Sequence, residues 1–338
     1  MGALVEETTF LGQPAVRGAN DDLAFVVVPG WGSNLLSLVD QKTGAELLRV
    51  PGSAAEFWGS PVLYGTPVLF PPNRIEGGRF TYKGRDYRFD VNEPELGNHI
   101  HGLVYHRPWD VLQTDTEGVG RAVVATRFDA LQSRDRDDIA RQFPHHFVIT
   151  MRYILDGGTL HKTAEVHNAG SEPFPFGLGF HTTFRFPEEA ARFALTVERR
   201  WQLDDKLLPT GRLEPLPYEE NLRNGMSLRG IALDDAFFVG DAGWSGGTAP
   251  GSAATIRYRA GSAELEIRYE ADRHFKHWVV YNADGRSGFI CPEPYTWITN
   301  APNLDLPASV TGLQELQPGE TKVFATSISV RRRLPDDE

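Results

Sequence analysis

The sequence has very little cysteine, with Cys291 as the only example among 338 residues. A single thiol excludes an internal disulfide and is typical of proteins from a reducing compartment. Long apolar runs are also missing, since no stretch approaches the roughly 18 apolar residues that a membrane-spanning helix needs. The first residues, MGALVEETTF, lack the basic and apolar segments of a secretory signal. We therefore expect a cytoplasmic protein with no membrane partner.

Basic residues are in the minority, with 34 Lys and Arg against 45 Asp and Glu and a formal net charge of −11. The acidic residues are scattered along the chain and form no tail. This balance disfavours nucleic acid or an anionic membrane as a partner, because both carry negative charge. A neutral ligand such as a sugar is compatible with it.

Helical periodicity is scarce, and only residues 53–58 and 188–192 are expected to form a turn or two of helix. Instead, 34 glycines and 23 prolines separate short runs rich in Val, Ile, Phe, Tyr and Thr, which is typical of strands. Residues 240–254 are interpreted as a surface loop rather than a linker between domains. We predict an all-β fold in which residues 1–338 form one large antiparallel sandwich. The expected strands include LAFVVVP, RFTYKGRDYRFDV, RAVVATRF, HFVITMRYIL, HKTAEVHNA, AATIRYRA, AELEIRY, HWVVYN and KVFATSISV.

The stretch FPFGLGFHTTFRF, residues 174–186, alternates with period two. Its even positions are mostly phenylalanine and are predicted to face the core, while its odd positions include Gly177, Gly179 and His181. Glycine packs nothing against a strand, so this second face is predicted to be nearly bare. Two glycines beside one histidine indicate a place where another group approaches the backbone.

Glu293 lies between two prolines in ICPEPYTW. Pro292 fixes the chain before it, and Pro294 biases Glu293 itself away from the helical region, so its backbone is held extended. Aromatic and aliphatic neighbours would desolvate the carboxylate and raise its pKa, which suits a base acting near neutral pH. The alternative is an ordinary loop glutamate.

Two further polar clusters precede these, Asn73-Arg74 in LFPPNRIEGGRF and the histidines of GNHIHGL. Arg74 could equally be a surface charge. His99 and His101, at spacing i, i+2, would share one face of a strand. Together with a later histidine and glutamate they could bind a metal in the manner of a cupin.

Six segments, taken in order, resemble the aldose 1-epimerase (mutarotase) family over about residues 20 to 325. They are PVLFPPNRIEGGRFTYKGRDYRF, NHIHGLVYHRPWDV, PFGLGFHTTFRF, LLPTGRLEPL, LDDAF and FICPEPYTWITNAPNL. The resemblance implies a galactose mutarotase-like β-supersandwich that interconverts the α and β anomers of an aldose without a cofactor or metal. The partner would be a small sugar, and the chain a monomer or homodimer.

The resemblance also implies roles for individual residues. His181 would be the general acid and Glu293 the general base, on opposite sides of one sugar, while Arg74, His101 and Asp234 would hold its hydroxyl groups. Asp234 is chosen over Asp235 because the family's aspartate stands three residues before an aromatic residue. Thr182-Thr183 departs from the Pro-Tyr that usually follows the family's histidine, which puts the preferred sugar in doubt.

On this interpretation Gly177 and Gly179 leave room for the sugar ring, and Trp109, Trp278 or Trp297 could stack on it. A phosphorylated sugar would need two or more converging cations. Arg74 with Arg79, or Arg273 with Lys276, are near enough in sequence to supply them. A sugar-binding or regulatory module of the same fold, without turnover, is the alternative function.

Overall fold

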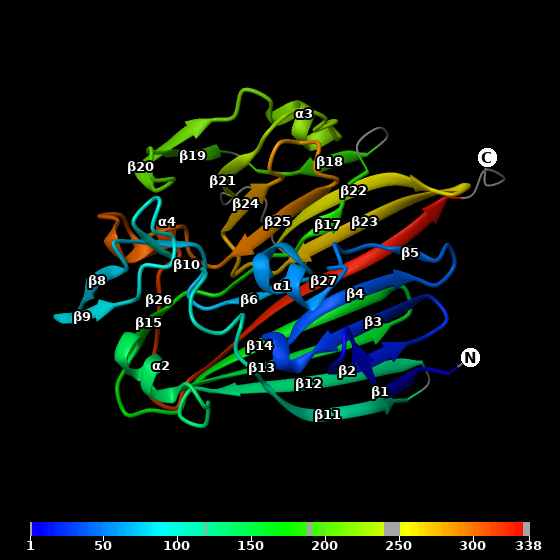
Figure 1. Ribbon diagram of the computed structural model, residues 1–338. Helices are drawn as coiled ribbons and strands as arrows, with labels where there is room; N and C mark the ends of the chain where they lie inside the picture. Colours follow the sequence, from blue (N-terminus) through cyan, green and yellow to red (C-terminus); the bar gives the residue numbers. More distant parts are fainter. Residues whose placement is uncertain (1, 119, 188–190, 198, 240–250, 334–338) are drawn as a thin grey trace.

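The computed structural model describes residues 2–118, 120–187, 191–197, 199–239 and 251–333, and these form a β-rich structure with few short helices (Figure 1). The predicted β-supersandwich is confirmed, because the ladders that build it are antiparallel. The extent of the domain, residues 1–338, stays a prediction. In the part of the chain described, no helix is long and apolar enough to cross a membrane.

The longest strands form an eight-stranded sheet that crosses the whole molecule (Figure 1). Strand β27, near the end of the chain, lies between β14 and β23, so strands from both halves of the sequence share this sheet. In spatial order the strands are β11 (Asp110–Glu117), β12 (Arg121–Asp129), β13 (Phe147–Asp156), β14 (Thr159–Asn168), β27 (Thr321–Arg333), β23 (Ala263–Ala271), β22 (Ser252–Ala260) and β18 (Arg192–Leu195).

A five-stranded sheet formed by the N-terminal residues packs against β11 and β12 of the large sheet. Its strands follow the sequence in space, since each is joined to the next by a short connection. They are β1 (Leu4–Phe10), β2 (Gln13–Ala19), β3 (Leu23–Val28), β4 (Asn34–Asp40) and β5 (Ala45–Glu46).

A second large sheet carries Asp234 and Glu293, and His181 lies in the connection between two of its strands. In spatial order it comprises β20 (Pro209–Pro215), β19 (Arg199–Leu203), β21 (Asp234–Phe238), β24 (His277–Tyr281), β25 (Phe289–Tyr295), β16 (Gly179–Phe180) and β6 (Val68–Leu69), with β17 (Phe184–Arg185) also paired to β25. Three two-stranded pairs complete the β structure: β7 (Arg74–Glu76) with β10 (Asn98–Ile100), β8 (Arg79–Tyr82) with β9 (Arg85–Arg88), and β15 (Phe174–Phe176) with β26 (Gln314–Leu316).

The helices are short and lie in connections between strands. The helix expected at residues 53–58 is confirmed as α1 (Ala54–Gly59), and the Ser53 side chain caps it by accepting a hydrogen bond from the Glu56 N–H at 3.1 Å. The one expected at 188–192 falls largely outside the described residues, and Arg192 belongs to a strand. The others are α2 (Arg136–Gln142), α3 (Glu219–Asn224), α4 (Ala308–Thr311) and the 3₁₀ turns η1 (Pro29–Trp31), η2 (Pro61–Leu63) and η3 (Ala301–Asn303).

The loop predicted at residues 240–254 also needs a correction. Residues 240–250 lie outside the described residues, but residues 252–254 already belong to strand β22. The alternation of β22, in which Ser252, Ala254, Ile256 and Tyr258 are buried, begins inside the segment that its small residues had marked as loop.

Candidate active site

Twelve residues from distant parts of the chain line a cavity of about 350 Å³. This volume falls at the small end of the range for ligand sites, about 300–1,000 Å³. All five residues predicted for the site are among those lining it, so the structure brings them together. The lining residues are Ser60, Val62, Leu63, Asn73, Arg74, Ile100, His101, His181, Asp234, Val279, Tyr281 and Glu293.

His181 and Glu293 are in direct contact, with 3.2 Å between His181 Nε2 and Glu293 Oε1. The two strands on either side explain why. Gly179 pairs with Tyr295 and Phe184 pairs with Ile290, and both pairs follow one register that sets His181 opposite Glu293. The expectation that the two groups lie on opposite sides of a ligand is therefore wrong.

The two prolines beside Glu293 interrupt the ladder at this point. Thr296 N–H donates to Leu178 O at 2.9 Å, so the even-numbered residues of this strand direct their N–H groups toward the histidine segment. Pro292 and Pro294 occupy two such positions and have no N–H to donate. The odd-numbered residues between β16 and β17 hydrogen-bond on the other side, where His181 N–H donates to Pro67 O at 3.1 Å and Thr183 N–H to Gly65 O at 2.9 Å.

Burial dominates the electrostatics of this pair. Glu293 is 1% exposed, and burial raises its pKa well above the ordinary value, an effect that a hydrogen bond from the Tyr295 hydroxyl to Glu293 Oε2 opposes. Burial also lowers the pKa of His181 to about 3. Both shifts disfavour charge, so the contact is suited to sharing one proton, with one group as donor and the other as acceptor.

Arg74 reaches the cavity from β7, and an ion pair with Glu93 fixes its guanidinium. Its Nε and Nη2 both donate to the carboxylate of Glu93, at 2.9 Å for the pairs Nε–Oε2 and Nη2–Oε1. The side chains are 12% and 17% exposed. This bidentate arrangement fixes the plane of the guanidinium and neutralises much of its charge. The alternative of a free surface charge is wrong.

His101 follows directly after strand β10, where the chain turns sharply. It has a φ of 66° and Asn73 a φ of 56°, both in the left-handed region that non-glycine residues avoid, and the His101 N–H donates to Asn73 O at 3.0 Å. The turn aims the imidazole at His181, with 5.1 Å between the ring centroids. Burial lowers the pKa of His101 well below its usual value.

Asp234 opens strand β21 and faces the cavity, whereas Asp235 points elsewhere. Asp235 accepts a hydrogen bond from the Tyr218 hydroxyl at 3.2 Å on Oδ2. Burial raises the pKa of Asp234, and the guanidinium of Arg74 opposes that rise. Asp234, which the family resemblance favoured over Asp235, is thus the aspartate in the cavity lining.

Two expectations about how a ligand would be packed are wrong. A Cβ atom on Gly177 would lie 2.3 Å from the indole of Trp297, and one on Gly179 would lie 2.3 Å from the ring of Tyr295. The glycines therefore make room for these rings, and the face that seemed bare is buried.

The tryptophans proposed for stacking, Trp109, Trp278 and Trp297, are at most 5% exposed and are absent from the cavity lining. The aromatic residue that does line the cavity is Tyr281. It had no signal in the sequence beyond its place in a strand.

The metal site proposed on His99 and His101 is not formed. The left-handed turn at His101 takes the two rings apart, and His99 packs on Phe89 while its Nδ1 donates to Asp90 O at 2.7 Å. A different group of possible ligands exists, since one donor atom from each of His181, Cys291 and Glu293 lies within 4.8 Å of the other two.

The cations that could have bound a phosphate do not converge here. Arg79 is exposed on β8, and Arg273 and Lys276 line a separate cavity of about 430 Å³. Among the described lining residues of the first cavity, Arg74 is the only arginine or lysine.

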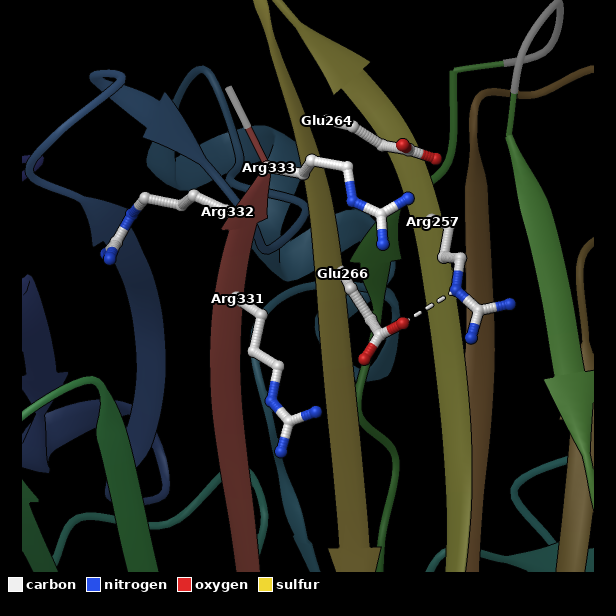
Figure 2. A pocket seen from close by; sticks show the side chains of 6 residues that line it. All are labelled: Arg257, Glu264, Glu266, Arg331, Arg332 and Arg333. Carbon is white, nitrogen blue, oxygen red and sulfur yellow. Dashed lines mark hydrogen bonds and ion pairs between the residues drawn. The ribbon is translucent and has the colours of Figure 1, made fainter. Parts of the chain in front are cut away.

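A larger hollow of about 560 Å³ lies over the outer face of β22, β23 and β27. Figure 2 shows arginines and glutamates side by side there, with Arg257 Nε donating to Glu266 Oε2 at 2.7 Å. Arg332 turns away from the others (Figure 2). Its Nε donates to Asp40 Oδ1 at 2.6 Å. The described lining of this larger hollow contains no histidine, cysteine or other group suited to proton transfer near neutral pH.

Comparison with known proteins agrees with the architecture. The family model described as aldose 1-epimerase matches residues 14–329. A galactose mutarotase-like protein from Clostridium acetobutylicum is 27% identical and superposes with a TM-score of 0.90, covering 98% of this chain and 99% of that one. Galactose 1-epimerase from Lactobacillus acidophilus shares the fold at 15% identity, with a TM-score of 0.71 and coverage of 98% of both chains.

Sequence relatives match over shorter stretches. The galactose mutarotase of Rattus norvegicus is 24% identical over 228 residues, which are 63% of this chain and 63% of that enzyme. The Escherichia coli protein YphB, itself uncharacterized, is 24% identical over 180 residues, which are 53% of this chain and 55% of that protein.

Proposed function

Because the chain belongs to the aldose 1-epimerase family, we propose that it is a mutarotase that interconverts the α and β anomers of a neutral aldose. The observation that carries this proposal is the contact between His181 and Glu293 in the lining of the cavity. The remaining polar lining residues supply hydrogen-bond donors and acceptors of the kind that a sugar's hydroxyl groups require.

The reaction needs one proton donor and one proton acceptor at the same time. Glu293 takes the proton of the anomeric hydroxyl, the bond from C1 to the ring oxygen breaks with its electron pair going to that oxygen, and His181 gives the ring oxygen a proton. The open aldehyde turns about C1–C2, and closure reverses both transfers, so each group regains its starting state.

The direct contact of the two groups fits this chemistry. The anomeric oxygen and the ring oxygen are both bonded to C1, so an acid and a base for them must be close neighbours. Burial favours the pair in which Glu293 holds the shared proton and His181 is neutral. This proton therefore passes across the 3.2 Å contact to His181 before Glu293 accepts the proton of the anomeric hydroxyl. Each positioned partner typically contributes about 10²- to 10⁴-fold to the rate.

The charges around the cavity support a substrate without phosphate. Arg74 is already committed to Glu93, while Asp234 and Glu293 bring carboxyl groups to the same lining. A phosphate would meet one largely neutralised cation and two acidic side chains, whereas its recognition favours two or more free cations. Neutral aldoses are therefore expected to be turned over in preference to sugar phosphates.

The test is polarimetry on freshly dissolved α-glucose and α-galactose, with His181→Asn and Glu293→Gln as variants. Each should lower the enzymatic rate by at least about 10²-fold. His277→Asn is the matched control, because His277 is equally buried but is absent from the cavity lining. Rates near that of the wild type in either test variant would refute the assignment.

The same experiment separates the alternative, a sugar-binding module without turnover. Such a module would bind aldoses in calorimetry and leave the rate of mutarotation at that of buffer alone. A panel of aldoses and their phosphates in both assays would identify the substrate. Light scattering would test the predicted monomer or homodimer, and cell fractionation the predicted cytoplasmic location.

A further inference from the structure

Cys291 lies beside the proposed proton-transfer pair without taking part in it. It is two positions before Glu293 on β25, so both side chains emerge on the same face of the strand. Cys291 is fully buried, is absent from the cavity lining, and its Sγ lies 3.3 Å from the hydroxyl oxygen of Thr183. One donor atom each from His181, Cys291 and Glu293 lies within 4.8 Å of the other two.

This set of donors matches the preference of zinc. Thiolate, imidazole and carboxylate are the three protein ligands that zinc uses, and sites with three of them leave a fourth position open. Bonds of 2.0–2.1 Å in a tetrahedron place neighbouring nitrogen and oxygen ligands about 3.3 Å apart. The distance of 3.2 Å from His181 Nε2 to Glu293 Oε1 is already close to that value.

Charge and access favour the same conclusion. A thiolate and a carboxylate together balance the two positive charges of the ion, so a buried site of this composition is neutral overall. His181 and Glu293 line the cavity, and a cation could therefore enter from it and keep its open position toward it. Ordinary packing of a small thiol would explain the burial of Cys291, and the proposed proton transfer would explain the two groups beside it. What points to a metal is that one donor atom from each of the three lies within 4.8 Å of the other two.

We propose that His181, Cys291 and Glu293 form a binding site for one Zn²⁺ ion or a similarly thiophilic divalent cation. On the proposed function, a bound ion also stops mutarotation, because it occupies the atoms that would exchange protons with the sugar. Binding requires the thiol to lose its proton, which passes to the solvent together with the proton that His181 and Glu293 share. The Thr183 hydroxyl also lies 3.3 Å from this sulfur, and Thr183 is itself absent from the cavity lining.

The test is titration of the metal-free protein with Zn²⁺ against a chromophoric chelator, with no sugar present. One ion per chain is expected. Cys291→Ser and Cys291→Ala should each weaken the affinity by at least the roughly 10–100-fold that changes around metal ligands cost. Two replacements are used so that a folding defect in one of them does not decide the result. His274→Ala is the matched control, because His274 and Asp272 form a more exposed histidine–carboxylate pair that could bind zinc adventitiously.

Cobalt serves as a second probe of the sulfur ligand. Co²⁺ bound through a thiolate gives a charge-transfer absorption in the near ultraviolet, which the wild type should show and both Cys291 variants should lack. Mg²⁺, which prefers oxygen ligands, should not compete with Zn²⁺. Equal Zn²⁺ affinity in the wild type and in both Cys291 variants would overturn the site.

The activity readout is kept separate from the binding readout. In metal-free buffer Cys291→Ser should mutarotate sugars at the rate of the wild type, and Zn²⁺ should inhibit the wild type but not the variant. Stoichiometric binding in a chain that never accelerates mutarotation would support the metal site and overturn the proposed function. Mutarotation that is equally inhibited in both proteins would show that zinc acts elsewhere.

Discussion

The hydroxyl of Tyr295 offers a direct way to test whether Glu293 acts as a base. This hydroxyl donates to Glu293 Oε2 and accepts from Asn73 Nδ2 at 3.4 Å, and the residue is fully buried. Tyr295→Phe removes the donor but keeps the ring that fills the space beside Gly179. The change therefore removes one hydrogen bond on the carboxylate and the longer one from Asn73.

The size of the effect follows from that bond. A hydrogen bond to a charged group contributes about 1.5–3 kcal/mol, and about 1.36 kcal/mol corresponds to one pKa unit. Tyr295 lowers the pKa of Glu293, so its loss should raise that pKa further and lower the ionised fraction by about 10- to 100-fold. A base works only when ionised, so the rate falls at low pH, and this fall is the acid limb of the plot of rate against pH. The acid limb should therefore move to higher pH by as much as the pKa rises.

The assay is polarimetry of mutarotation from pH 5 to pH 9, with the rate in buffer alone subtracted at each pH. Below the limb the variant should be slower by about 10- to 100-fold, and above the limb its rate should approach that of the wild type. Tyr269→Phe is the control, since that buried hydroxyl accepts from Thr182 Oγ1 at 3.0 Å and does not touch Glu293. An acid limb that stays in place, or a loss of rate that is equal at every pH, would refute the reasoning.

Three further predictions concern stability, measured by urea unfolding. Burial raises the pKa of Glu293 above its ordinary 4.5, so the folded state keeps a proton that the unfolded state loses, and stability falls as the pH rises above that value. Glu293→Gln should thus be more stable than the wild type at pH 8 and nearly equal to it at pH 4, and a gain that grows toward low pH would contradict this. Burial lowers the pKa of Lys162 from 10.5 to about 7, so the unfolded state binds more protons between these values and the wild type gains stability as the pH rises through them. Lys162→Met should therefore stabilise the folded state by up to about 5 kcal/mol at pH 7 and by much less at pH 10. No gain at pH 7 would show that contacts of the charged amine in the folded state offset the cost of burying it. Gly179→Ala should destabilise the protein by about 1–3 kcal/mol, because it forces a Cβ atom into the Tyr295 ring. Gly59→Ala is the control and should not destabilise it in this way, because the space around its Cβ is open. Equal effects of the two substitutions would contradict the steric argument.

Most of the strands could be predicted from the sequence, because one-sided burial imposes period two. The run HFVITMRYIL became β13, and its alternation matches the buried positions from Ile149 to Leu155. The stretch 174–186 shows where this reasoning stops. Its even positions are core, as predicted, but β15 pairs with β26 instead, and the two prolines of β25 remove the donors that would have joined β16 to β17.

The site residues could be predicted because they lie in short motifs. The groups that hold these residues in place or shift their pKa values could not be predicted. Glu93, which holds Arg74, is 19 residues away in a loop. The two glycines were misread because a missing side chain marks a close neighbour without telling whether that neighbour is a ligand or a ring of the protein itself. His99 and His101 were paired on the assumption of an unbroken strand, and a single left-handed residue invalidated it.

The left-handed backbone of Asn73 and His101 has a consequence for how this protein responds to selection. Both residues hold a conformation that glycine adopts at no steric cost, so replacement by glycine at either position would relax the chain while removing a polar group from the cavity. At Asn73 the gain is opposed, because its side chain accepts from the Arg74 N–H at 2.8 Å and donates to the Tyr295 hydroxyl. At His101, whose buried Nδ1 has no hydrogen-bond partner among the described residues, a screen that rewards only resistance to heat would favour glycine although the proposed sugar contact would be lost.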